Sequence, residues 1–221
     1  MKEYWEQRAK KYGENSVLSE GLPKFYNDFF EYFQKRAISK ILRKNRNMEG
    51  IKVFEVGCGA GRWLKFFSEK GAHVLGIDIS NAMLQMAKAT RGVLALINML
   101  ACNLGFRDEA FDLVLFITVL QHIPYELQYY AIKEICRVAK REGHILILET
   151  TDPKESAPHV FPLTKEEWIH RFKKSGCKFI DVEPLDFSPL IRLYFKFAGK
   201  ISRIILRKHQ CTYQKPSAHN I

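Results

Sequence analysis

The sequence lacks any apolar run long enough to span a membrane. Hydrophobic residues make up 47% of the 221 residues, yet no stretch approaches the roughly 18 to 20 consecutive apolar residues that a spanning helix needs. The first residues, MKEYWEQRAKKYG, are charged and aromatic, and they have neither the apolar centre nor the cleavage site of a signal peptide. We therefore expect a cytoplasmic protein whose length accommodates one α/β domain with additions.

Cysteine is scarce and scattered. The five cysteines form no CxxC pair, and their odd number argues against a disulfide framework and against a zinc site. We expect reduced thiols, most of them small core residues, and no bound metal. The positions are Cys58, Cys102, Cys136, Cys177 and Cys211.

Acidic residues are absent beyond Asp186, so the net charge of +11 is concentrated at one end of the chain. An excess of positive charge favours anionic partners such as nucleic acid, acidic lipid headgroups or phosphorylated metabolites. The alternative is a basic surface that serves solubility. The basic residues after Asp186 are Arg192, Lys196, Lys200, Arg203, Arg207, Lys208 and Lys215.

Three glycines follow one apolar segment within five positions, in the stretch VFEVGCGAGRW of residues 53–63. Such a cluster indicates a sharp turn or the close approach of a ligand, because glycine costs backbone entropy elsewhere. A phosphate-binding P-loop would need GxxxxGK[ST], which this stretch does not supply. A dinucleotide-binding turn would need GxGxxG, and Arg62 occupies the position of its third glycine.

Strand-like and helix-like segments alternate along the middle of the chain. This alternation predicts βαβ units and a parallel sheet that is covered on both faces. In such a sheet the glycine cluster lies at the carboxyl end of the first strand, where ligands bind. Strands are expected at 51–56, 72–78, 92–98, 111–117, 143–150 and 177–184, with 202–208 as a last strand if the C-terminal segment completes the sheet. Helices are expected at 62–70, 81–89, 125–140 and 164–176.

The ends of the chain differ from this middle. Residues 1–48 are predicted to be mainly helical, with Phe25, Phe29, Phe30 and Phe33 on one helix face packed on the main domain. Near the other end, Thr164 and Glu167 have the spacing of a capping box. We expect a helical arm or lid (1–48), a core (49–186) and a basic extension (187–221).

The motif EVGCGAG, followed by GIDIS, resembles the class I S-adenosylmethionine-dependent methyltransferases. Three further segments are similar to that family in the expected order: HVLGIDISNAMLQMAK, LGFRDEAFDLVLFITVLQHIP and ICRVAKREGHILILE. The resemblance covers residues 51–150 and, more loosely, 164–184. It implies a Rossmann-like, mostly parallel, seven-stranded sheet with helices on both faces.

The resemblance also implies S-adenosylmethionine as cofactor, with S-adenosylhomocysteine as product. Gly57 and Gly59 would let the backbone approach the methionine portion, and Asp78 would accept both ribose hydroxyls. Glu55 would lie near the amino-acid end of the cofactor or, alternatively, cap the following turn. The other cofactor-binding residues that we carry over are Cys58, Ile79, Ala101, Asn103, Ile117 and Tyr12.

Two features concern the rim of this site. Many family members carry an acid that accepts the adenine amino group, and the corresponding position here falls at or near Leu100, where no acid is available. Asn103 or a backbone carbonyl would then take that role. At the start of the chain, YWEQRAKKYG resembles a lid segment, with Trp5 and Tyr12 facing the cofactor or acceptor or simply anchoring the arm.

The family transfers the methyl group by in-line displacement, so the protein mainly supplies positioning and a dry site. An oxygen acceptor would also need a base, and His122, just beyond the fourth strand, is placed either for that role or for holding its loop. His159 and His170 are less well placed in the expected fold. The absence of a DPPY or NPPY tetrapeptide after that strand argues against amino-group methylation of DNA bases or glutamine.

Basic residues recur every three or four positions between 189 and 208, among apolar ones. Such a helix can lie on an anionic membrane surface or follow RNA phosphates, and the alternative is a helix and a final strand that complete the sheet. We favour a methyltransferase that acts on a small-molecule or lipid-like acceptor. The alternatives are an RNA methyltransferase and a catalytically silent, cofactor-binding partner subunit.

Overall fold

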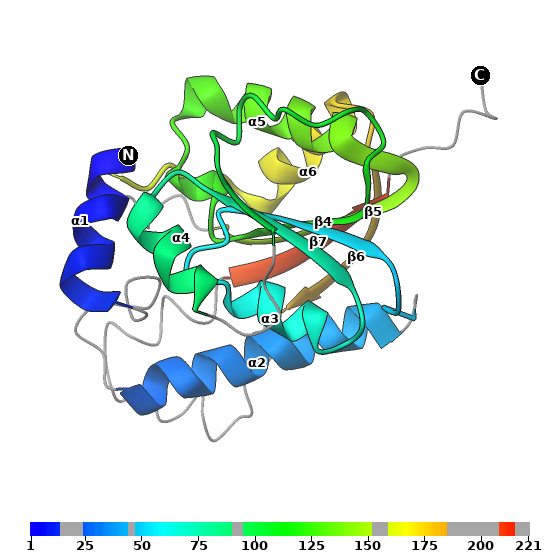
Figure 1. The fold of residues 1–221 in the computed structure, drawn as a ribbon. Coiled ribbons are helices and arrows are strands. Elements are labelled where there is room, and N and C mark those ends of the chain that lie inside the picture. The colour runs from blue at the N-terminus through cyan, green and yellow to red at the C-terminus, as the bar shows by residue number, and fades with distance from the viewer. Residues whose placement is uncertain (14–23, 44–46, 90–94, 152–158, 185–207, 215–221) are drawn as a thin grey trace, which may run out of the picture.

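A computed structural model describes residues 1–13, 24–43, 47–89, 95–151, 159–184 and 208–214 (Figure 1). Five parallel strands form the centre of one sheet: β1 (Lys52–Val56), β2 (His73–Asp78), β3 (Ala95–Asn98), β4 (Phe111–Ile117) and β5 (Ala139–Thr150). Two antiparallel strands, β6 (Lys178–Pro184) and β7 (Lys208–Gln214), extend it in the order β3-β2-β1-β4-β5-β7-β6. The predicted Rossmann-like α/β fold with a parallel sheet is confirmed.

The central strands are apolar because both faces of the sheet are covered. In β1, Val53, Phe54 and Val56 are all buried. On one face a core cluster joins β1 and β4 to α5 (Tyr125–Val138) and α6 (Lys165–Lys174). On the other face a second cluster joins the sheet to α2 (Lys24–Arg43) and α3 (Arg62–Ser68), and Figure 1 shows these two pairs of helices on opposite sides of the sheet.

Several local predictions hold in detail. The fourth strand has the expected bounds, and Thr164 and Glu167 form the capping box at the start of α6. In α2, Phe29, Phe30 and Phe33 pack against the second core cluster, as the helix-face prediction requires. The side chain of Phe25 lies outside the described residues.

The boundary between α5 and β5 differs from the prediction. The helix ends at Val138, and β5 begins at Ala139 rather than at Gly143. The reason is a contact that is distant in sequence, because the carbonyl of Val138 accepts the N–H of Ala110 at 2.8 Å. Ala139 then pairs with Phe111 before the register shifts.

The strand order reverses between β1 and β4, and in such sheets ligands bind at the carboxyl ends of the strands beside this point. Helix α1 (Lys2–Tyr12) lies at that end beside α4 (Asn81–Lys88), as Figure 1 shows. No helix among the described residues is long and apolar enough to cross a membrane. The expected basic helix or strand at 189–208 lies almost entirely outside the described residues.

Candidate active site

The glycine cluster forms a tight turn between β1 and α3. Gly57, Gly59 and Gly61 have φ angles of 68°, 53° and 79°, in the left-handed region that favours glycine. A Cβ atom on Gly57 would lie 2.5 Å from Cγ2 of Val119, a residue of the loop after β4. The turn therefore places the backbone of Gly57 directly against the side chain of Val119, where only glycine fits.

Asp78 ties this turn to the end of β2. Its Oδ2 accepts the N–H of Gly59 at 2.9 Å, and its Oδ1 accepts the N–H of Ser80 at 2.8 Å. Burial raises the pKa of the Asp78 carboxyl, while these N–H donors act in the opposite direction. Asp78 is only 8% exposed, so the carboxylate is held in one orientation at the strand end.

Asn98 is a residue of this end of the sheet that the sequence reasoning missed. Its side-chain amide donates to the carbonyls of Asp78 and Ile79, at 3.0 and 2.9 Å. It therefore fixes the loop that follows β2. A polar residue closing the apolar third strand was the available signal.

Glu55 is the second buried acid of the site. It is 2% exposed within β1, and its Oε2 has no hydrogen-bond partner among the described residues. Burial raises the pKa of Glu55 well above its ordinary value; Arg62 lowers it and Asp78 raises it further. A buried carboxylate oxygen without a partner fits a positively charged group, such as the ammonium of an amino acid.

The remaining residues expected at the cofactor have varied surroundings. Burial raises the pKa of the Cys58 thiol, which packs with Leu64 and Leu84 and so keeps its proton. Ile117 is buried in the core cluster that includes α2 and α3. Ala101 lies partly buried in the turn after β3, with Asn103 exposed two residues later.

The loop after β4 is fixed by Glu149, which is 1% exposed at the end of β5. Its Oε1 accepts the N–H groups of Val119 and Leu120, both at 2.8 Å, and its Oε2 accepts that of Gln121 at 3.2 Å. Thr118 enters this loop with a φ of 58°, an uncommon conformation for a residue with a side chain. The Glu149 carboxylate thus stabilises a strained turn, and His122 is the first residue after the three whose N–H groups it binds.

His122 and His159 form a pair. Nδ1 of His122 lies 2.8 Å from the carbonyl oxygen of His159, and the two rings stack with centroids 5.6 Å apart. Because a carbonyl can only accept, Nδ1 of His122 carries a proton, and Nε2 of the neutral ring is left as an acceptor. The expectation that His159 is less well placed was wrong, since Phe161 pairs with Gln121 through an N–H to carbonyl bond of 2.6 Å and brings this segment to the loop. His170 is exposed on α6.

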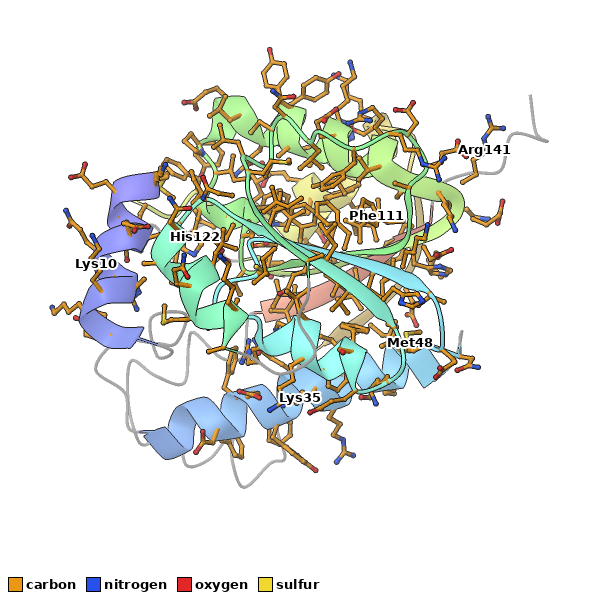
Figure 2. The ribbon with its side chains drawn as sticks, in the orientation of Figure 1. Lys10, Lys35, Met48, Phe111, His122 and Arg141 are labelled. Carbon is orange, nitrogen blue, oxygen red and sulfur yellow. The ribbon has the colours of Figure 1, made fainter. Side chains whose placement is uncertain are left out.

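Helix α1 covers the histidine pair. The Tyr4 hydroxyl and Nε2 of His159 share a hydrogen bond of 3.1 Å, and their rings stack with centroids 4.4 Å apart. The Trp5 ring meets the His122 ring edge-on at 5.0 Å, and Figure 2 shows His122 close to this helix. Tyr12 instead has its ring near Arg8 and Lys11 of its own helix.

The comparisons with known proteins agree with this arrangement. A family model described as a methyltransferase domain matches residues 54–147. A demethylmenaquinone methyltransferase of Staphylococcus epidermidis is 32% identical over 178 residues, which are 76% of this chain and 70% of that protein. The Shouchella clausii protein of the same name is 32% identical over 157 residues, but the match spans only 63% of its length.

Solved structures share the fold at lower identity. A magnesium protoporphyrin IX methyltransferase from Synechocystis with bound S-adenosylmethionine has a TM-score of 0.69 at 15% identity, and the match covers 98% of this chain and 95% of that one. A Haloferax volcanii putative methyltransferase in complex with the Trm112 activator has a TM-score of 0.72 at 17% identity, over 93% and 98% of the chains. With the glycine turn, the two buried acids and these relatives together, the chain belongs to the class I S-adenosylmethionine-dependent methyltransferases.

Proposed function

We propose that the protein transfers a methyl group from S-adenosylmethionine to a small-molecule or lipid-like acceptor. The observation that carries this proposal is the pair of buried acids, Glu55 and Asp78, on either side of the glycine turn. Two of the similar relatives are named demethylmenaquinone methyltransferases, and these names favour a lipid-like acceptor.

We assign the cofactor to the carboxyl ends of β1 and β2. Asp78 would accept hydrogen bonds from the ribose hydroxyls, since each carboxylate oxygen has a lone pair beyond the one that Gly59 or Ser80 uses. Glu55 would meet the ammonium, and Ile79, Ala101 and Asn103 would line the site. Cys58 and Ile117 pack in the core and the Tyr12 ring lies near Arg8 and Lys11, so their contribution would be to the shape of the site. When bound, S-adenosylmethionine supplies a methyl group that is already activated on a sulfonium.

His122 is the residue that we assign to the acceptor. Its Nδ1 proton is committed to the His159 carbonyl, so Nε2 is the atom that can take a proton from an acidic hydroxyl or carbon. The side-chain amide nitrogen of Gln121 lies 3.3 Å from this Nε2 atom of His122. Glu149 and the carbonyl of His159 keep the ring in place.

Two alternatives remain as outcomes of the same test. A mouse probable tRNA methyltransferase 9B is 32% identical over 124 residues, but the match covers only 26% of that protein. The second alternative is a catalytically silent, cofactor-binding partner subunit.

The test incubates the purified chain with methyl-labelled S-adenosylmethionine and a fractionated cell extract, with demethylmenaquinone as a defined acceptor. Label in the organic phase is the expected result. Label confined to RNA or to polar metabolites would overturn the lipid-like acceptor. Cofactor binding without any transfer would indicate a silent subunit.

We also retain the wider organisation as part of the proposal. It comprises an arm at 1–48, a core at 49–186 and an extension at 187–221, with the seven-stranded sheet completed by β6 and β7. The hydrogen-bond registers of β7 with β5 and β6 support the last point. A cytoplasmic protein that reaches an anionic membrane through residues 189–208 would meet a lipid-like acceptor directly, and vesicle co-sedimentation of the full chain tests this.

A further inference from the structure

Three consecutive residues of α1 contact both halves of the candidate site. Glu6 reaches the end of β2 on the cofactor side, where its carboxylate accepts the Ser80 hydroxyl at 2.7 Å and the Ala82 N–H at 3.3 Å. Tyr4 and Trp5 reach the histidine pair on the acceptor side. A single helical turn thus bridges segments that are separated by 40 or more residues of sequence.

The cofactor-side contact is made to Ser80, two residues after Asp78. The N–H of Ser80 is bound by Asp78, and its hydroxyl caps α4 by accepting the N–H of Met83 at 3.2 Å. The pKa of Glu6 is lowered, first by the bond from Ser80, which means that the contact is made by the ionised carboxylate. Glu6 therefore places a negative charge at the N-terminal end of α4, where it is favoured.

The acceptor-side contacts form a continuous stack of rings. Tyr4 stacks on His159, and His159 stacks on His122. The Trp5 ring adds an edge-to-face contact with His122, at a centroid distance of 5.0 Å. The main-chain carbonyl of His159 is also the acceptor that fixes the tautomer of His122.

Ala9 is the one fully buried side chain of α1, and Tyr4, Trp5 and Glu6 are half-buried. The polar and ring contacts of these three residues therefore contribute to the position of α1 on the site. Loss of the Glu6 contact would free the turn that carries the two aromatic rings.

We propose that Glu6 and Tyr4 are positioning residues for methyl transfer: Glu6 docks α1 on the cofactor half, and Tyr4 thereby holds His159 and the Nδ1–H tautomer of His122. The inference rests on the proposed function for its catalytic consequence, although the coupling itself can be observed without turnover. A displacement of about 1 Å at a catalytic group is enough to cost on the order of a hundredfold in rate.

The first test is the imidazole nitrogen NMR spectrum of the full chain with S-adenosylhomocysteine. Wild-type His122 is expected to show a protonated Nδ1 and an unprotonated Nε2. Glu6→Ala and Tyr4→Phe should both shift these resonances toward exchanging tautomers, whereas Glu3→Ala, an exposed acid of the same helix, should not. An unchanged His122 spectrum in Glu6→Ala would overturn the coupling.

The second test measures transfer to the acceptor fraction that wild-type protein labels. Glu6→Ala and Tyr4→Phe should each lower kcat/KM for the acceptor by at least about tenfold, with the loss in the double variant smaller than the product of the two. The Kd for S-adenosylmethionine should change less than about twofold, because Asp78 and Glu55 remain in place. If the decreases in kcat/KM of the two single variants multiply fully in the double variant, a shared role is refuted. If the wild-type protein transfers no methyl group, the proposed function is refuted, but the NMR result still tests the coupling.

Discussion

The main-chain N–H of Gly59 donates to Oδ2 of Asp78 across 2.9 Å, so the glycine turn and the end of β2 form one rigid unit. Replacing Asp78 with Ala removes this bond and the acceptor that we assign to the ribose hydroxyls. We expect the affinity for S-adenosylmethionine to fall by about 2 kcal/mol, as for the loss of hydrogen bonds to a charged group. Isothermal titration calorimetry measures this. Asp112→Asn, at the opposite end of the sheet, is the control, and unchanged affinity in Asp78→Ala would remove the ribose assignment.

Gly57→Ala should destabilise the fold for two reasons, a positive φ and a clash with Val119. The new Cβ would lie 2.5 Å from a methyl carbon of Val119 at a φ of 68°. We expect a loss of about 2 to 3 kcal/mol in the free energy of unfolding. Gly13→Ala has a φ of 56° with nothing within 4 Å, so chemical denaturation of both variants separates the clash from the backbone strain. Equal losses in the two variants would show that the clash contributes nothing.

The raised pKa of Glu55 predicts that the stability of the free protein and its affinity for the cofactor change with pH in opposite directions. In the free protein the folded-state pKa is above the unfolded one, so the contribution of Glu55 to stability is present at low pH and is lost as pH rises through the folded pKa. A cationic ligand group favours the ionised form, so cofactor affinity should rise with pH over the same interval. Thermal melts with and without S-adenosylhomocysteine test both slopes. Glu55→Gln should flatten both plots of melting temperature against pH. If the slopes persist in this variant, another titrating group is responsible for them.

Glu149→Gln should disturb the loop that presents His122. The carboxylate accepts three main-chain N–H groups, and an amide NH₂ would face one of these donors instead. We expect stability to fall by about 2 to 3 kcal/mol, together with a loss of acceptor turnover. Glu126→Gln, an exposed acid of α5, serves as the matched control in thermal denaturation and transfer assays. A Glu149→Gln protein as stable and active as this control would contradict the role.

His122→Asn separates proton transfer from loop support. The asparagine amide can still donate to the His159 carbonyl in place of Nδ1, but it offers no basic nitrogen in place of Nε2. For an acceptor that must lose a proton, kcat should fall by about 10² to 10⁴ with a near-wild-type melting temperature. The low-pH limb of the pH–rate profile, where the rate rises as the base loses its proton, should disappear as well. Retention of kcat would mean that His122 only holds its loop.

Local patterns were sufficient for most of the fold. The spacing of apolar residues predicted β1 and β4, and the glycine cluster predicted the end of the sheet that binds the ligand. Each of these features depends on residues within about one helical turn or one strand. The boundary at Ala139 could not be found in this way, since it is decided by pairing with Ala110 and Phe111, far along the chain. The antiparallel strand β7 follows a segment whose pattern allowed a helix or a strand.

The candidate site likewise has a part that the sequence predicts and a part that depends on contacts between distant segments. The acids of the cofactor side are adjacent to the glycine motif or end the next strand, so sequence position alone indicates them. The acceptor side joins Tyr4, His122 and His159, and only tertiary contacts bring them together. A histidine or tyrosine outside a motif carries no local signal of such a partner.

The two buried acids have a further consequence for turnover. In the assignment that we propose, Glu55 meets the ammonium and Asp78 the ribose, groups that S-adenosylmethionine and S-adenosylhomocysteine share. Neither acid can distinguish the spent molecule from the fresh one, so discrimination is left to whatever surrounds the sulfur. The protein should therefore be inhibited strongly by its own product, and its sustained rate in a cell would follow the ratio of the two molecules.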